Sequence, residues 1–217
     1  SLGLTQVSVF KKPVVSIFST GDELKDPESK ESDLRLGEIY DANRPALKAL
    51  LLDLPIDLID LGILSDDKEK ISSSMLEASE KSDLLVTSGG VSVGDADHVV
   101  DVISQMGELD FWRLNLKPGK PLAYGSINNT PIIGLPGNPV STIVTALLLL
   151  KPVLTHLCGS VPSPPTRLKA SLDGELSHQI GRAEYIRAHF TQKNKEIWVS
   201  SNQDQSSNRL SSFLDSN

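Results

Sequence analysis

Short apolar runs alternate with amphipathic stretches along the first two thirds of the chain. Three of these runs, Val14 to Phe18, Ile56 to Leu61 and Leu84 to Thr87, end beside turn-forming residues, which predicts strands. Between the first two, leucines at positions 47, 50, 51 and 54 recur at the spacing of a helix face. The pattern therefore predicts strand, helix, strand, with each strand running into a polar loop.

Polar residues mark where the helices start. The sequence Asn-Arg-Pro at 43–45 predicts an N-cap with an early helical proline. Either Asp66 or Asp67 can cap the next helix, and a further helix is expected over roughly 97–106. A helix after Pro139 and three more apolar runs complete the pattern. These runs are Phe111 to Leu116, Pro121 to Tyr124 and Pro131 to Leu135.

This alternation predicts an α/β fold with a doubly wound, mixed or parallel sheet and helices on both faces. We assign residues 14–160 to this domain. The proline-rich segment 161–165 predicts a stiff linker. Beyond it, alternating runs predict antiparallel strands, so residues 161–217 are expected to form part of a C-terminal β domain. The runs are Thr166 to Ser171, Glu184 to Thr191 and Glu196 to Ser200.

Charge is unevenly distributed along the chain. The net charge of −7 argues against general nucleic-acid binding. Residues 111–172 contain no Asp or Glu, whereas six basic residues lie there: Arg113, Lys117, Lys120, Lys151, Arg167 and Lys169. A basic segment in an acidic protein suits a small anionic ligand, although a mostly buried apolar segment would account for the same pattern.

The single cysteine, Cys158, cannot form a disulfide within the chain, which favours a reducing, cytoplasmic location. The most apolar stretch, Val140 to Leu157, is interrupted by Lys151 and Pro152 and is short of a membrane span. We therefore expect a buried helix there and no membrane span. Because the chain starts without a methionine, we take it to be part of a longer protein.

The loop 88–97 combines three glycines with two carboxylates. Glycine lets backbone N–H groups approach phosphate oxygens, and Asp95 and Asp97 can hold a hydrated Mg²⁺. The loop is neither a Walker loop nor G-x-G-x-x-G, which disfavours nucleoside triphosphatases and Rossmann dehydrogenases. Another loop at a strand end, Leu64 to Asp67, contains Asp66. Asp66 is open to two interpretations, as a helix cap or as a metal ligand.

Two proline-containing loops follow in the basic segment. Lys117-Pro118-Gly119-Lys120-Pro121 places two ammonium groups three residues apart on a constrained backbone. The loop before Ser141 opens a helix, whose N-terminus together with the serine hydroxyl could hold an oxyanion. Alternatively, both loops are only tight turns, and Asn138 or Ser141 caps the helix. The four histidines have no metal-ligand spacing.

In this order, the motifs resemble the molybdopterin molybdenumtransferase family, which includes the gephyrin E domain. The residues that carry the resemblance are Ser19 to Leu24, Thr87 to Gly94, Lys117 to Pro121 and Leu135 to Ser141. The resemblance covers essentially the whole chain and implies the molybdopterin-binding fold. It also implies that residues 1–13 are the tail of N-terminal domains that the chain lacks. It implies that the protein takes adenylated molybdopterin and molybdate, cleaves the adenylate with release of AMP and leaves molybdenum on the dithiolene.

The resemblance also implies residue roles. Asp66 and Asp97 fall at the Mg²⁺ positions and, with Lys120, are the implied catalytic residues. The implied pterin-binding residues are Glu23, Ser88, Gly89, Gly90, Ser92, Gly94, Asp97, Arg113 and Lys117. Molybdate is implied to lie at Lys120, Pro121, Ser141, Arg187 and Ser207. The serine assignment could shift by one, because Asn208 replaces the second serine of the family pattern.

Alternative functions stay open beside the insertase. A molybdopterin adenylyltransferase would share the sheet, but the Lys-Pro-Gly-Lys-Pro loop and the appended β segment disfavour it. A gephyrin-like scaffold would bind a receptor or cytoskeletal partner, and no groove for one is evident in the sequence. The resemblance further implies a homodimer, in which an N-terminal domain of one subunit faces the α/β domain of the other.

Overall fold

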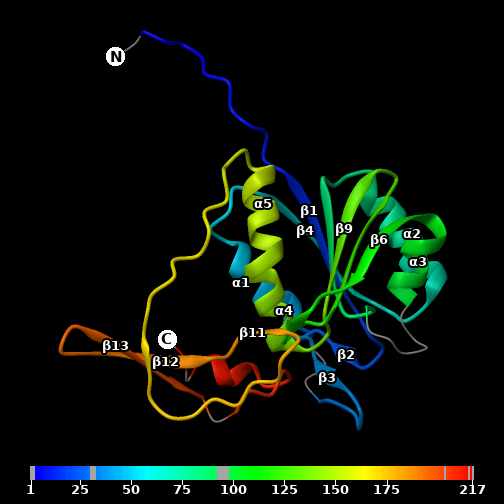
Figure 1. Cartoon of the computed structure of the whole chain (residues 1–217). Helices are drawn as coiled ribbons and strands as arrows, with labels where there is room; N and C mark the ends of the chain where they lie inside the picture. Colours follow the sequence, from blue (N-terminus) through cyan, green and yellow to red (C-terminus); the bar gives the residue numbers. More distant parts are fainter. Residues whose placement is uncertain (1–2, 30–32, 92–97, 203, 215, 217) are drawn as a thin grey trace.

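A six-stranded mixed sheet forms the centre of the molecule (Figure 1). The structure is a computed structural model that describes residues 3–29, 33–91, 98–202, 204–214 and 216. The strands of the sheet, in spatial order, are β4 (Asp57–Leu64), β1 (Val14–Thr20), β5 (Leu84–Ser88), β9 (Thr130–Leu135), β8 (Pro121–Ile127) and β6 (Gly107–Arg113). The first four run parallel, whereas β8 and β6 are antiparallel to their neighbours. The expected α/β fold with a mixed sheet is confirmed.

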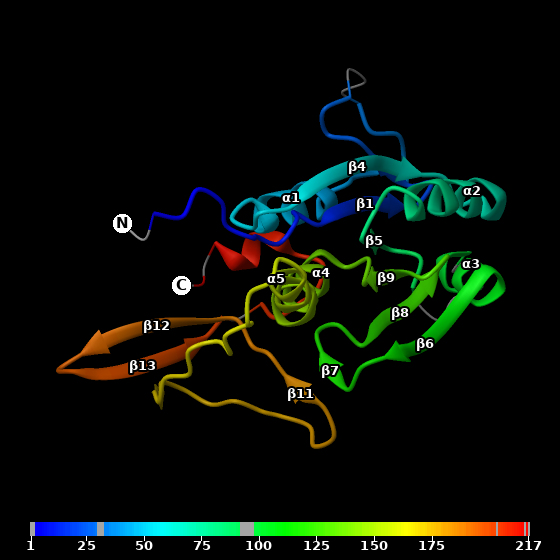
Figure 2. The same cartoon turned by 90° about the horizontal axis from the view of Figure 1, so that it is seen from above.

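Helices cover both faces of this sheet, as Figure 2 shows from above. On one face lie α2 (Lys68–Ser79) and α3 (His98–Met106), and on the other lies α1 (Asn43–Leu51) beside a long helix. The long helix consists of α4 (Pro139–Thr145), a π-helical turn η1 (Ala146–Leu150) and α5 (Lys151–Leu157). This arrangement explains why the central strands read as continuous apolar runs, since they are buried on both sides.

Each face of the sheet has its own hydrophobic core. Along β9, Ile132 packs with α2 and α3, whereas its neighbour Ile133 packs with α1 and the long helix. In strand β5, Leu85 likewise belongs to the core beneath α2 and α3, whereas Val86 belongs to the core on the other face of the sheet. All side chains of β5 are buried. Within β1, the buried polar side chain of Ser16 shares a hydrogen bond with the Ser82 hydroxyl at 2.7 Å.

The long helix runs without a break from Pro139 to Leu157. Among the described residues, it is the helix whose length and composition alone would allow it to cross a membrane. The expected helix is confirmed, and it continues through Lys151 and Pro152. In the π-helical turn the Lys151 N–H donates to the Ala146 carbonyl, and this wider turn accommodates a proline. Ala146, Leu150 and Leu154 are fully buried in the core, so the helix packs as a core helix of the α/β unit.

The C-terminal segment forms a small sheet of its own, set apart from the central one (Figure 1). Strands β12 (Ala188–Lys193) and β13 (Glu196–Ser201) form an antiparallel hairpin, and β10 (Ser171–Leu172) pairs with β13 in parallel. The prediction of three antiparallel strands is therefore only partly correct. Residues 166–170 are not a strand, and the connection from β10 is long enough for the crossover that a parallel pair requires.

The remaining short elements lie near the loops. Strand β11 (Ala183–Glu184) pairs in parallel with β7 (Leu116–Lys117) and so joins the C-terminal segment to the α/β unit. Strand β2 (Leu24–Lys25) pairs with β3 (Ile39–Tyr40), and a 3₁₀ turn, η2 (Leu210–Phe213), follows the hairpin. At the far end of α5, Gly159 lies against the ring of Phe10, 2.1 Å from where a Cβ would stand, so only glycine fits there.

The start of α1 differs from the predicted cap. Asn43 is the first helical residue rather than the N-cap, and the carboxylate of Asp41 accepts hydrogen bonds from the N–H groups of Asn43 and Arg44. The Asn43 side chain instead donates to the Gly137 carbonyl at 2.7 Å. Asp41 precedes the helix, and its Oδ1 accepts from both N–H groups while its Oδ2 accepts from Nε of Arg44.

Arg44 lies at the centre of a buried ion network. Its guanidinium contacts the carboxylates of Asp41 at 3.2 Å, Asp60 at 2.8 Å and Asp26 at 2.6 Å. Desolvation lowers the pKa of Arg44, but the hydrogen bonds that its guanidinium donates to these carboxylates outweigh it, and the net pKa is raised. The network joins α1, β4 and the loop after β2, which fixes the loops around the sheet edge.

We expect Arg44→Met to lower the free energy of unfolding by about 3 kcal/mol, because Asp41, only 2% exposed, would lose its charged partner. Urea unfolding at pH 7 measures the change. Lys48→Met is the matched control, since it removes only a half-exposed contact to Asp60 and should cost less than about 1 kcal/mol. Equal losses in both variants would contradict the proposed importance of the Arg44 network.

Candidate functional site

Loops gather at the carboxyl ends of the parallel strands, where α/β sheets bind their ligands. A cavity of about 890 Å³ lies there, and its lining includes the acidic side chains Glu23, Asp41 and Asp66. We call it the acidic cavity. Of the predicted residues, Glu23, Asp66, Ser88, Gly89, Gly90, Pro121 and Ser141 line it.

Asp66 is tied to the neighbouring loop, and Asp67 caps α2. The Asp22 N–H donates to the Asp66 carboxylate at 3.3 Å, and the Asp66 N–H donates to the Asp22 carboxylate at 3.1 Å. The Asp67 carboxylate accepts from the N–H groups of Glu69 and Lys70, at 2.9 and 3.1 Å. The helix-cap interpretation therefore belongs to Asp67, which leaves the Asp66 carboxylate on the cavity wall.

The turn after β5 brings backbone close to the cavity. Gly90 has a φ of +66°, and a Cβ there would lie 2.5 Å from the Val99 side chain and 2.9 Å from the Thr20 hydroxyl. Thr20 Oγ1 is buried, and no hydrogen-bond partner for it is found in the described part of the chain. The predicted residues Ser92, Gly94 and Asp97, with Asp95, lie outside the described residues.

A second cavity, of about 250 Å³, adjoins the first and is rich in cations. We call it the basic cavity. Its basic side chains are Lys117, Lys120, Arg182 and Arg187. The Lys117 to Pro121 loop forms one wall, and Gly119 is required in it, because a Cβ would lie 2.5 Å from the Thr145 side chain.

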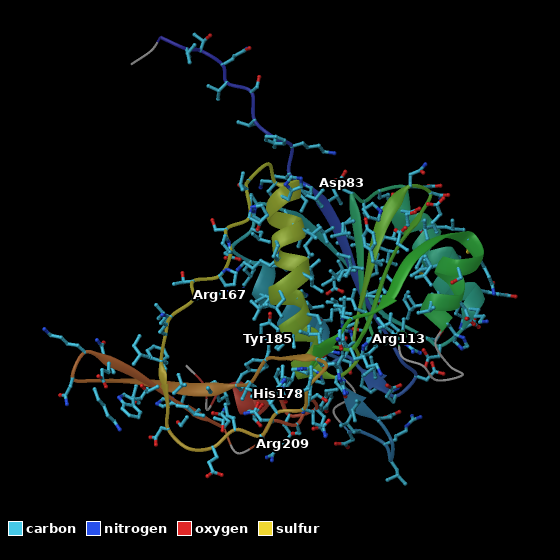
Figure 3. The ribbon with its side chains drawn as sticks, in the orientation of Figure 1. Asp83, Arg113, Arg167, His178, Tyr185 and Arg209 are labelled. Carbon is cyan, nitrogen blue, oxygen red and sulfur yellow. The ribbon has the colours of Figure 1, made fainter. Side chains whose placement is uncertain are left out.

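Arg182 was not among the predicted site residues. It is exposed, and the pairing of β11 with β7 brings it to the cavity, with the Ala183 N–H donating to the Asn115 carbonyl at 3.1 Å. Because this pairing joins segments far apart in the sequence, local pattern gives no signal for it. Tyr185 and His178 lie near the same place, below the start of the long helix (Figure 3).

Arg187 lines the basic cavity but is largely engaged within the protein. Its guanidinium donates to the Ser212 hydroxyl, to the Ser206 carbonyl at 3.1 Å and to the Asp204 carbonyl at 3.3 Å. The residue is only 7% exposed, and burial lowers the pKa of Arg187. Arg187 therefore holds residues 204–207, here called the C-terminal loop, in place. The sequence had instead predicted that the Arg187 side chain closes the site over a bound anion.

Ser141 lies between the two cavities. Ser141, Asn138 and Pro121 line both of them. Asn138 occupies the N-cap position of α4, but its side chain makes no capping hydrogen bond. Ser141 is 4% exposed. The Val140 N–H donates to the Ser207 carbonyl at 3.0 Å, so this N–H group at the helix start is satisfied by the C-terminal loop rather than by the Asn138 side chain.

The remaining predicted residue, Arg113, is exposed at the end of the edge strand β6. It does not line either cavity, and in Figure 3 it lies on the side of the sheet away from Tyr185. The structure therefore brings together the acidic residues near β1 and β4 with the basic residues after β7. Acidic and basic side chains thus line two adjoining cavities that share a wall.

Comparisons with known proteins agree with this geometry. The family model described as "Probable molybdopterin binding domain" matches residues 16–156. The chain is 37% identical over 219 residues to the molybdopterin molybdenumtransferase of Haemophilus influenzae, covering 100% of this chain and 54% of that protein. It is 39% identical over 184 residues to gephyrin of Dictyostelium discoideum, covering 73% of this chain and 26% of that protein.

Solved structures show the same arrangement. The molybdopterin biosynthesis moeA protein of Pyrococcus horikoshii superposes with a TM-score of 0.72 at 27% identity, covering 95% of this chain and 48% of that one. A molybdenum cofactor biosynthesis protein of Pyrococcus furiosus, at 23% identity and a TM-score of 0.67, shares the fold. The chain spans 54% or less of the two curated relatives named above.

We expect Asp67→Ala to lower the free energy of unfolding near pH 7, whereas Asp66→Ala should change it little. The backbone N–H groups of Lys70 and Glu69 hold the pKa of Asp67 below its ordinary value of 3.8. A depressed pKa stabilises the fold above pH 3.8 and loses that effect as the pH falls further. The difference between wild type and Asp67→Ala should therefore shrink in urea unfolding at about pH 2 to 3. A loss in Asp66→Ala equal to that in Asp67→Ala would restore the cap interpretation of Asp66.

Proposed function

This chain belongs to the family described as the probable molybdopterin binding domain, and we propose that it is the substrate-binding part of a molybdopterin molybdenumtransferase. In this proposal the whole protein acts in molybdenum cofactor biosynthesis. It inserts molybdate into adenylated molybdopterin and releases AMP. Similarity over all 217 residues to a curated molybdopterin molybdenumtransferase supports the assignment.

The observation that carries the proposal is the joining of an acidic and a basic cavity at Ser141. The reaction needs both, because the pterin phosphates call for a metal ion held by carboxylates, whereas molybdate is a dianion that needs cations. Local fields of opposite sign in one cleft would hold the two substrates side by side. Two adjoining cavities of opposite charge therefore favour an enzyme that transfers molybdenum between two bound substrates over a protein that binds only one of them.

In the acidic cavity, Asp66 and Glu23 fit a Mg²⁺ ion that keeps several waters and also binds phosphate oxygens. Among the described residues no cluster of three or more metal-ligating side chains exists, and such a partly hydrated ion needs only one or two carboxylates. When bound, the ion would neutralise charge that develops on the adenylate phosphates. The glycine turn after Ser88 would give backbone donors to the same phosphates.

In the basic cavity, Lys117 and Lys120 would bind molybdate, and the Ser141 hydroxyl would donate to it. The rigid Pro121 would form the wall between the oxyanion and the pterin. Arg187 and Ser207 would contribute indirectly, because they position the C-terminal loop against the start of α4. Each charge-assisted hydrogen bond to the oxyanion would contribute roughly 1.5 to 3 kcal/mol.

We further propose that the whole protein works as a cytoplasmic homodimer. Ile39 and Tyr40 of β3 line the acidic cavity while 54% and 41% exposed. Apolar side chains in this position leave the outer wall of the cavity to be covered by another subunit. Sedimentation of the whole protein would test the dimer.

Incubation of the whole protein with adenylated molybdopterin, Mg²⁺ and molybdate tests the proposed activity. Release of AMP together with molybdenum transfer to the pterin is the expected result. Consumption of ATP on bare molybdopterin would instead identify an adenylyltransferase. A protein that shows neither activity but captures receptor cytoplasmic loops would identify a scaffold.

We expect Lys120→Ala to weaken molybdate binding by about tenfold or more, since the loss of one charge-assisted bond of 1.4 kcal/mol corresponds to a factor of ten. Binding of adenylated molybdopterin should stay nearly unchanged. Lys151→Ala is the matched control, because Lys151 belongs to the same basic segment but pairs with Asp53 outside both cavities. Titration calorimetry measures both affinities, and unchanged molybdate binding in Lys120→Ala would refute the basic site.

We expect Asp66→Asn to weaken the Mg²⁺-dependent part of adenylated molybdopterin binding while thermal stability stays the same. The physical reason is that an amide cannot replace a carboxylate as a charged Mg²⁺ ligand. Asp57→Asn is the control, because Asp57 is an exposed residue at the opposite end of β4. Affinities measured with Mg²⁺ and with a chelator should converge in Asp66→Asn. If the variant keeps the full Mg²⁺ effect, Asp66 is not a ligand.

A further inference from the structure

The basic cavity contains one carboxylate, Glu184. Its Oε1 lies 2.7 Å from the ammonium nitrogen of Lys117, and its Oε2 lies 3.0 Å from Nδ1 of His178. The Glu184 side chain is 14% exposed, whereas that of Lys117 is 58% exposed. A carboxylate among cations that face an anion cavity needs an explanation, because it repels the ligand that those cations attract.

Glu184 also belongs to a third cavity, of about 370 Å³, next to the basic one. Both cavities are lined by Lys117, Lys120, Arg182 and Glu184, whereas His178 lines only the third cavity. Glu184 therefore lies where the two cavities meet, bound to the lysine that faces each of them. Lys117 holds the pKa of Glu184 below its usual range, with a second contribution from His178, so the carboxylate is charged at neutral pH.

The backbone around this ion pair is held independently of it. Glu184 and Lys117 are directly opposite in the pairing of β11 with β7. The Tyr185 N–H donates to the Lys117 carbonyl at 2.8 Å, and the Ala183 N–H donates to the Asn115 carbonyl. The Lys117 ammonium can therefore leave Glu184 and turn toward a ligand without separating the two strands.

We propose that Glu184 is an internal counter-anion, which holds Lys117 until an oxyanion enters the basic cavity and takes the lysine from it. The incoming oxyanion has to break the ion pair and lies close to the displaced carboxylate, so Glu184 lowers the affinity of the site. An enzyme gains from this when its bound oxyanion must be handed on rather than retained. The inference rests on the proposed oxyanion site and adds that a carboxylate of the same protein, Glu184, sets the affinity of this site.

Titration calorimetry with sulfate and with molybdate on the whole protein tests the inference. We expect Glu184→Gln to bind both dianions at least about threefold more tightly than wild type, since one competing ion pair and one repulsive charge are removed. The gain should be smaller for the monoanion nitrate, because the repulsion by Glu184 scales with ligand charge. Glu175→Gln, an exposed glutamate of the same segment outside the cavities, should leave all three affinities unchanged.

If Glu184 had a purely structural role, Glu184→Gln would bind anions more weakly, since loss of its ion pair with Lys117 would loosen the contact between β11 and β7. Equal or weaker binding by Glu184→Gln therefore overturns the inference. Lys117→Met provides a second test, because the gain from Glu184→Gln should largely disappear in the double variant if Lys117 mediates it. If the wild type binds anion and Glu184→Gln binds it no more tightly, only this inference is refuted. If neither protein binds anion, the proposed oxyanion site is refuted as well.

Discussion

Burial of the central sheet on both faces is the constraint from which the site follows. Helices cover the two sides of β1, β5 and β9, and these strands carry buried side chains in both directions. A polar group placed in the middle of such a strand would need a buried partner. Functional polar groups are therefore displaced to the ends of the strands, and the parallel order of four strands brings those ends to one edge of the sheet.

Opposite charges at that edge stay separate because neutral groups divide them. Pro121, Asn138 and Ser141 form the common wall of the acidic and basic cavities. Arg44 pairs with Asp41, which lines the acidic cavity, and with the nearby Asp26 and Asp60. These ion pairs offset part of the negative charge in and around the acidic cavity.

Much of the fold could be predicted from local pattern, since each strand, helix and glycine turn depends on neighbours in the sequence. Val14 to Thr20 and the turn at Gly89 and Gly90 are of this kind. The ends of elements were less predictable. The Asp41 side chain rather than that of Asn43 accepts from the first N–H groups of α1, and Asp67 rather than Asp66 caps α2. In both cases polar residues one or two positions apart compete for the same N–H groups.

The roles of Arg182, Glu184 and Arg187 could not be read from the sequence for a different reason. They depend on β11 meeting β7 and on the C-terminal loop meeting α4, and both contacts join segments distant along the chain. A motif places Arg187 near an anion, yet burial and three protein acceptors decide its part in the structure. Long-range pairing, not residue type, fixes such roles.

The unbroken helix from Pro139 to Leu157 has a mechanical consequence. Its 19 residues span roughly 28 Å. One end receives the Ser207 carbonyl beside the basic cavity, and the other leads to Gly159 beneath Phe10. The helix thus runs the length of the α/β unit between the basic cavity and the segment that precedes β1 (Figure 1). Because the backbone hydrogen bonds of a continuous helix hold its two ends at a fixed separation, the helix sets the spacing between Ser141 at the basic cavity and Leu157 at the far end of the α/β unit.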